Sequence, residues 1–223
     1  MVDISSPLIF PIGHYVGGHY PRPDAELDCH VVRIGWETYR IEGDEQFAVW
    51  ALAHGLPDSA DPDPWTRPTL LGAARAAGVP RTDAVLHDLL DKDLVIEVTP
   101  GTEEAVEFAQ VCRIRALQIG LGNTADDITR FAIGLADDHP LVSVPAFTYE
   151  LWKWGHVCDS LWHACQVFAA ATGGGALPGA APSDDAPTVE ADPERVLAQC
   201  LAATQALIAH GAAYLDEARE EYR

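Results

Sequence analysis

The chain has 223 residues, and 48% of them are hydrophobic, so a sizeable core can form and wholesale disorder is excluded. Its 34 acidic and 14 basic residues give a formal net charge of −20. This charge disfavours nucleic acid and anionic membrane surfaces as partners and favours a basic partner, although it could serve solubility alone. No apolar run approaches the ~20 residues that a membrane-spanning helix needs. The first residues also lack the pattern of a secretory signal, so we expect a cytoplasmic protein.

The N-terminal half begins with an expected irregular arm. Residues 1–27 contain clustered proline, glycine and histidine, which favour turns. Residues 29–34 and 37–41 are rich in β-branched side chains and predict two strands joined by a turn at Gly35. A helix is expected from residue 45 to 54, with Asp44 as its N-cap.

Three prolines in residues 56–65 predict a loop. Two further helices are expected at about 69–77 and 80–93, followed by a strand at 94–98. Two strands, three helices and a strand outline a winged helix. We therefore expect a winged-helix-like domain over residues 28–101.

The remainder of the chain predicts helices. Apolar spacing favours helices at 103–119 and 124–135 and a long helix at 145–170, which together form a helical domain over 102–170. Residues 171–191 contain many glycines and prolines and predict a flexible linker. Residues 192–223 are expected to form a C-terminal helix that starts with an Asp-Pro cap. The expected fold class is mostly α with a small antiparallel sheet (α+β).

A DNA-binding winged helix presents its third helix and its wing to the nucleic acid. Between Arg81 and Leu94, four acidic residues outnumber two basic residues, and the expected wing at 97–107 has four glutamates and no base. Each phosphate contact needs a cation. Nucleic acid is therefore the disfavoured partner.

The order of hairpin and three helices resembles the peptide-binding recognition elements of the biosynthesis of ribosomally made, modified peptides. The resemblance covers about Cys29 to Val98. It implies that a leader peptide adds as a strand to the edge of the hairpin and lies beside the third helix. The partner-binding positions that it implies are Thr38, Tyr39 and Arg40 on the strand and Arg81, Val85 and Asp88 on the helix.

Histidines and one carboxylate supply the candidate metal ligands. His156, Asp159 and His163 fall at i, i+3 and i+7 of the expected long helix, on one face, and could bind zinc. The alternative is an ordinary polar helix face. His14 and His19, together with a third histidine at position 30, offer a second and looser set of ligands.

The sequence contains no P-loop, no nucleophile elbow and no dinucleotide fingerprint. We therefore expect a non-catalytic accessory subunit that binds a protein or peptide partner and needs no cofactor. In its sharpest form this hypothesis places the protein in the biosynthesis of a peptide natural product. The alternative is a transcriptional regulator whose C-terminal helices dimerise or bind an effector. A homodimer and a metal-dependent activity stay open.

Overall fold

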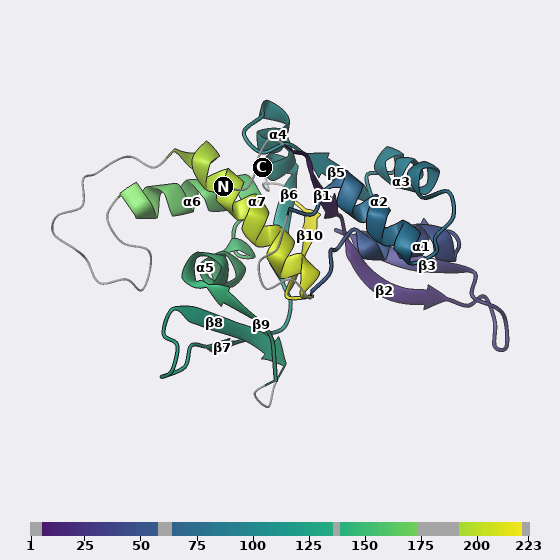
Figure 1. The fold of residues 1–223 in the computed structure, drawn as a ribbon, viewed down its shortest axis with the longest axis horizontal. Coiled ribbons are helices and arrows are strands. Elements are labelled where there is room, and N and C mark those ends of the chain that lie inside the picture. Colours follow the sequence, from purple (N-terminus) through teal and green to yellow (C-terminus); the bar gives the residue numbers. More distant parts are fainter. Residues whose placement is uncertain (1–5, 58–63, 136–138, 174–191, 220–223) are drawn as a thin grey trace.

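The computed structural model describes residues 6–57, 64–135, 139–173 and 192–219. Within these ranges it contains both helices and strands in quantity, and the strands form four small antiparallel sheets (Figure 1). The fold is therefore mixed α and β. The expectation of a mostly α protein with one small sheet is wrong, because most of the strands in the C-terminal half were predicted as helices.

The helices are α1 (Asp44–Leu52), α2 (Arg67–Ala76), α3 (Thr82–Asp91), α4 (Glu103–Val111), α5 (Ala146–Gly155), α6 (Leu161–Gly173) and α7 (Pro193–Ala209). The strands are β1 (Leu8–Pro11), β2 (His14–His19), β3 (Cys29–Ile34), β4 (Glu37–Ile41), β5 (Val95–Val98), β6 (Cys112–Ala116), β7 (Ile119–Gly122), β8 (Arg130–Leu135), β9 (His139–Pro145) and β10 (Ala213–Glu217).

The first lobe contains the sheet β2-β3-β4 and the helices α1, α2 and α3 (Figure 1). The two predicted strands at 29–34 and 37–41 are confirmed, and three helices follow them near the expected positions. One face of the sheet packs on the helices through a hydrophobic core that includes Val32, Ile41 and Trp50. Strand β2 lies within residues 1–27, the expected irregular arm, and pairs with β3.

Strand β1 also lies within the expected arm, and it separates two hydrophobic cores. All four of its residues are buried. Ile9 belongs to the core of the first lobe, whereas Leu8 and Phe10 belong to the core of the second lobe, because side chains alternate along a strand. Strand β1 pairs with β5, so β5 does not lead into a wing, and residues 103–111 form α4.

The second lobe consists of α4 to α7, the two-stranded sheet β6-β10 and the three-stranded sheet β7-β8-β9. The predicted helix at 103–119 ends at Val111, and the predicted helix at 124–135 is replaced by β8. In β6, buried Cys112 and Ile114 alternate with half-buried arginines. This period of two suits a strand, and β10 supplies its partner far along the chain.

The long helices predicted at 145–170 and in the C-terminal region also differ from the structure. A break at residues 156–160 separates α5 from α6. Helix α7 ends at Ala209, where a turn at Gly211 with a φ of 64° leads into β10. Most of the expected linker, residues 174–191, lies outside the described residues. No helix in the described ranges combines the length and apolar character needed to cross a membrane.

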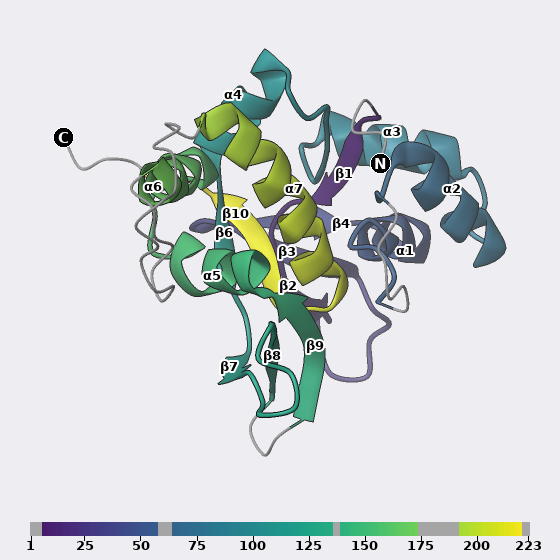
Figure 2. The same cartoon turned by 60° about the vertical axis from the view of Figure 1, so that its left-hand side comes forward.

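Helix α7 lies between the two lobes, beside the β6-β10 pair, in both views (Figure 1, Figure 2). The Gln205 side chain of α7 connects the two lobes. The amide nitrogen Nε2 donates to the carbonyl of Ile9 at 3.0 Å and to that of Trp65 at 2.8 Å. The amide oxygen accepts the Trp65 backbone N–H at 3.2 Å. One side chain therefore satisfies backbone groups on β1 and on the segment before α2.

We expect Gln205→Leu to lower the free energy of unfolding by about 1–3 kcal/mol, since it leaves backbone groups of Ile9 and Trp65 without partners. Urea denaturation followed by circular dichroism measures this change. Gln199→Leu is the matched control, because Gln199 is exposed on the same helix, and it should change stability by less than about 0.5 kcal/mol. Equal effects of the two substitutions would contradict this role of Gln205.

Candidate functional site

The hairpin β3–β4 presents an exposed aromatic side chain at its tip. Strands β3 and β4 pair in register from His30↔Ile41 to Ile34↔Glu37, so Gly35 and Trp36 form the turn. Gly35 has a φ of 56°, a left-handed conformation that glycine adopts without strain. Trp36 is 99% exposed. A large aromatic ring held fully in water is unusual, and such rings are enriched among residues that anchor protein interfaces.

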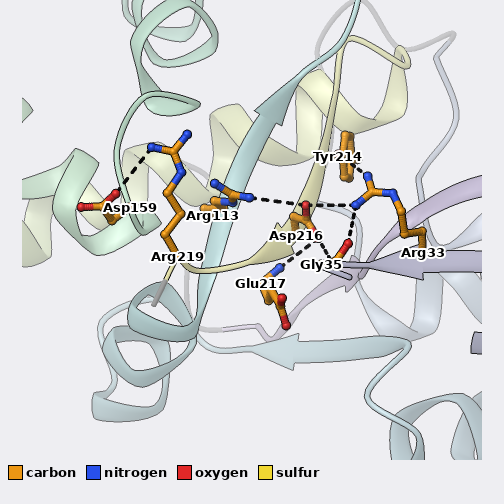
Figure 3. Close-up of polar contacts among 8 residues, drawn as sticks. All are labelled: Arg33, Gly35, Arg113, Asp159, Tyr214, Asp216, Glu217 and Arg219. Atoms are coloured by element: carbon orange, nitrogen blue, oxygen red, sulfur yellow. Dashed lines mark hydrogen bonds and ion pairs between the residues drawn. The ribbon is translucent and has the colours of Figure 1, made fainter. Parts of the chain in front are cut away.

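A buried carboxylate fixes the base of this tip. Asp216 on β10 is 1% exposed, and its Oδ1 accepts the backbone N–H of Gly35 at 2.6 Å and that of Glu217 at 3.2 Å (Figure 3). A β-carbon on Gly35 would also collide with the Glu217 side chain. The hairpin tip of the first lobe is therefore attached directly to a strand of the second lobe.

Arg33 joins the same network from β3. Its Nη1 donates to the carbonyl of Gly35 at 2.8 Å and its Nη2 to the hydroxyl of Tyr214 at 2.7 Å (Figure 3). Burial alone would lower the pKa of Arg33, but the hydrogen bond to Tyr214 and the charge of Asp216 raise it above its usual value. Arg33 therefore stays charged and ties the carbonyl of Gly35 to Tyr214 on β10.

Arg113 on β6 is the second cation beside Asp216. Its Nη2 lies 3.8 Å from Oδ2 of Asp216, and its Nε and Nη1 are buried with no hydrogen-bond partner in the described part of the chain. Burial lowers the pKa of Arg113, and the charge of Asp216 opposes this effect. The negative charge of Asp216 therefore balances the positive charges of two guanidinium groups, those of Arg33 and Arg113. Its charge is for this reason structurally important.

Strand β4 is one of the two edge strands of the sheet β2-β3-β4. Glu37, Thr38, Tyr39 and Arg40 are exposed, and only Ile41 is buried. The hydroxyl of Tyr39 donates to Glu37 at 3.2 Å. Thr38 and Arg40 point to the outer face of the sheet, because Tyr39 between them pairs with Val32 and shares its helix-covered face.

Carboxylates lie close to the phenol of Tyr39. The hydrogen bond to Glu37 is the main cause that raises the pKa of Tyr39, and burial is the next. The charges of Glu217 and Asp93 raise this pKa further, so both lie within electrostatic range of the ring.

The structure brings only part of the predicted partner-binding set to one surface. Thr38, Tyr39 and Arg40 lie together on β4, as the hairpin prediction implies. Arg81 precedes α3 in a left-handed conformation and pairs with Glu45 at 3.0 Å. Val85 belongs to the buried core, whereas Asp88 is exposed. Of the helix positions, Arg81 and Asp88 are therefore available to a partner without rearrangement.

The predicted metal ligands His156, Asp159 and His163 do not share one helix. His156 caps the end of α5, Asp159 lies in the break, and His163 lies on α6. Oδ2 of Asp159 is 3.7 Å from Nδ1 of His163, while its Oδ1 is 3.7 Å from Arg219 (Figure 3). The helical spacing that suggested a shared face does not apply across the break. Zinc binding by these three residues stays a prediction.

Sequence reasoning missed four residues of the candidate site: Asp216, Arg33, Gly35 and Trp36. Asp216 was expected inside a long helix. No local pattern near it indicates its hydrogen bond to Gly35, which lies 181 residues away in the sequence. The sequence did contain a signal for the exposed tryptophan, because Gly35-Trp36 lies between two predicted strands. The second residue of a tight turn has little to pack against. The turn was predicted, but its exposed tryptophan was not.

No family model matches this chain, and searches of curated proteins and of solved structures found no match.

We expect Asp216→Asn to lower the free energy of unfolding by about 2–4 kcal/mol, because it leaves Arg33 and Arg113 without their shared counter-charge. Chemical denaturation measures the change. Asp126→Asn is the matched control: Asp126 is exposed, and its loss should cost less than about 0.5 kcal/mol. A stability unchanged by Asp216→Asn would show that the carboxylate charge does not hold the hairpin.

Proposed function

We propose that this protein is a non-catalytic accessory subunit that binds an extended segment of a protein or peptide partner along the free edge of β4. The observation that supports this most directly is the open edge beside the fully exposed Trp36, both positioned by the buried Asp216 network. An added strand would make backbone hydrogen bonds to β4, and its alternate side chains would meet the two faces of the sheet.

The sheet has two edge strands, β2 and β4, because β3 lies between them. The outer backbone groups of both edge strands are therefore not paired within the sheet. Strand β2 contains a register shift next to Tyr15, whereas β4 pairs with β3 without a shift. A flat and regular edge is the better template for an incoming strand. This geometry favours β4 over β2 as the docking edge.

Charge favours a basic partner. Glu37 accepts the Tyr39 hydroxyl, and the charges of Glu217 and Asp93 also raise the pKa of Tyr39; the whole chain has a formal charge of −20. On the other face, Arg40 is already paired with Asp28 at 2.6 Å. A lysine or arginine on the partner beside Tyr39 would gain electrostatic attraction and an aromatic surface for its stem.

Within this proposal, the leader segment of a ribosomally made precursor peptide is the partner that the resemblance implies. The winged-helix regulator alternative gains no support from the surface of α3. Arg81 at the N-cap of α3 is paired with Glu45, and Arg75 on α2 is paired with Asp83 of α3. Asp88 and Asp91 are exposed on α3, and these carboxylates would repel phosphates.

The first test selects linear peptides that bind the full chain from a random displayed library and titrates the best one, labelled with a fluorophore, by anisotropy. We expect Tyr39→Pro to weaken binding at least about tenfold, because proline removes the N–H that pairs β4 with Val32 of β3 and so disturbs the edge strand. Leu121→Pro is the matched control, since β7 is an edge strand of the other three-stranded sheet.

A second arm of this test changes only the peptide. N-methylation of alternate backbone amides should abolish binding for one set of positions and spare the other, because only one set faces β4. A selected peptide that binds the wild-type chain and Tyr39→Pro equally, and that tolerates methylation at every position, would show that the protein uses another surface.

Trp36→Ala should lower the affinity for the selected peptide about tenfold or more and leave the free energy of unfolding within about 0.5 kcal/mol. The reason is that the ring is exposed and supports no core. Trp154→Ala is the control, because Trp154 is 44% exposed on α5 in the other lobe and should not affect binding. The reverse ranking of the two variants would place the peptide on the second lobe.

A further inference from the structure

Three potential metal ligands meet where the strands β2 and β3 end. His19 and Cys29 are directly opposite each other in the antiparallel register, and the backbone N–H of Asp28 donates to the carbonyl of His19 at 2.9 Å. One ligand atom from each of His19, Asp28 and Cys29 lies within 4.8 Å of the other two. The strand pairing itself therefore holds an imidazole, a carboxylate and a thiol together.

These distances suit a small ion after minor side-chain rotation. Nδ1 of His19 and Oδ2 of Asp28 are already 3.2 Å apart. Tetrahedral zinc, with bonds of about 2.0–2.3 Å, spaces its ligand atoms by about 3.2–3.8 Å. The side chains of His19 and Asp28 are 49% and 40% exposed, so they can move, whereas Cys29 is fully buried. An ion would enter from the exposed side and reach the sulfur below it.

Arg40 on β4 binds the carboxylate of the central ligand, Asp28. Its Nη2 donates to Oδ2 of Asp28 at 2.6 Å, and this hydrogen bond is the main cause that lowers the pKa of Asp28, followed by the one from His19. Nδ1 of His19 lies 3.2 Å from the same oxygen, so the two contacts hold the Asp28 carboxylate beside His19 and Cys29.

We infer that His19, Asp28 and Cys29 form a binding site for a thiophilic divalent cation, with zinc as the fitting ion. Imidazole, carboxylate and thiolate are the three ligand types that zinc takes in proteins, and three protein ligands leave a fourth position for water or a partner's side chain. Oδ1 of Asp28 accepts no hydrogen bond from the described residues, so ligation need not displace Arg40. This inference is independent of the peptide-binding proposal.

The test titrates the full chain, freed of metal by a chelator, with zinc chloride in a calorimeter. We expect saturable binding of one zinc ion per chain. His19→Ala, Asp28→Asn and Cys29→Ala should each weaken it at least about tenfold. His19 and Asp28 are exposed, so their variants are expected to fold even if removal of Cys29 destabilises the core. His87→Ala and Asp91→Asn are the matched controls, because these residues form an exposed His–Asp pair at 3.5 Å without a thiol.

Cobalt(II) provides a second readout that identifies the ligand. A thiolate-to-cobalt charge-transfer band should appear in the wild-type chain and in the two controls and be absent from Cys29→Ala. Zinc should also raise the melting temperature of the wild-type chain but not that of His19→Ala. The absence of saturable zinc binding would overturn the inference. So would binding that survives all three substitutions, or binding that is lost on His156→Ala and His163→Ala instead.

Discussion

Strand β1 is the element on which the rest of the structure depends. It is only four residues long and completely buried, and its two faces belong to different hydrophobic cores. Each core is incomplete without it, since Ile9 faces one and Phe10 the other. Gln205 then satisfies the carbonyl of Ile9 from α7. Strand β1 is thus buried on both faces, and its paired backbone groups connect the two lobes.

The second connection between the lobes positions the candidate binding surface. Asp216 accepts the N–H of Gly35 from inside the protein, and Arg33 holds the carbonyl of the same residue. A hairpin tip at the end of a three-stranded sheet would otherwise be mobile. Because its backbone is fixed, the fully exposed Trp36 is presented to solvent in one defined place, and a partner pays less conformational entropy to bind it.

The two proposals concern opposite ends of one hairpin. Trp36 lies at the turn between β3 and β4, whereas Cys29 and His19 lie where β3 begins and β2 ends. Arg40 lies on the free edge and contacts Asp28. The proposed metal site would use Oδ1 of Asp28 while Oδ2 stays bonded to Arg40, so the two surfaces need not compete for this side chain.

The sequence by itself determined the local elements of the first lobe. The β-branched segments at 29–34 and 37–41 and the apolar faces of α1 to α3 specify their own conformation, because each pattern is complete within a few residues. Only the tertiary structure decided that 112–116 and 213–217 are strands, since each requires the other as a partner almost 100 residues away. The same holds for the buried role of Asp216 and for the pairing of β1 with β5. Local spacing cannot encode a partner that is distant in the chain.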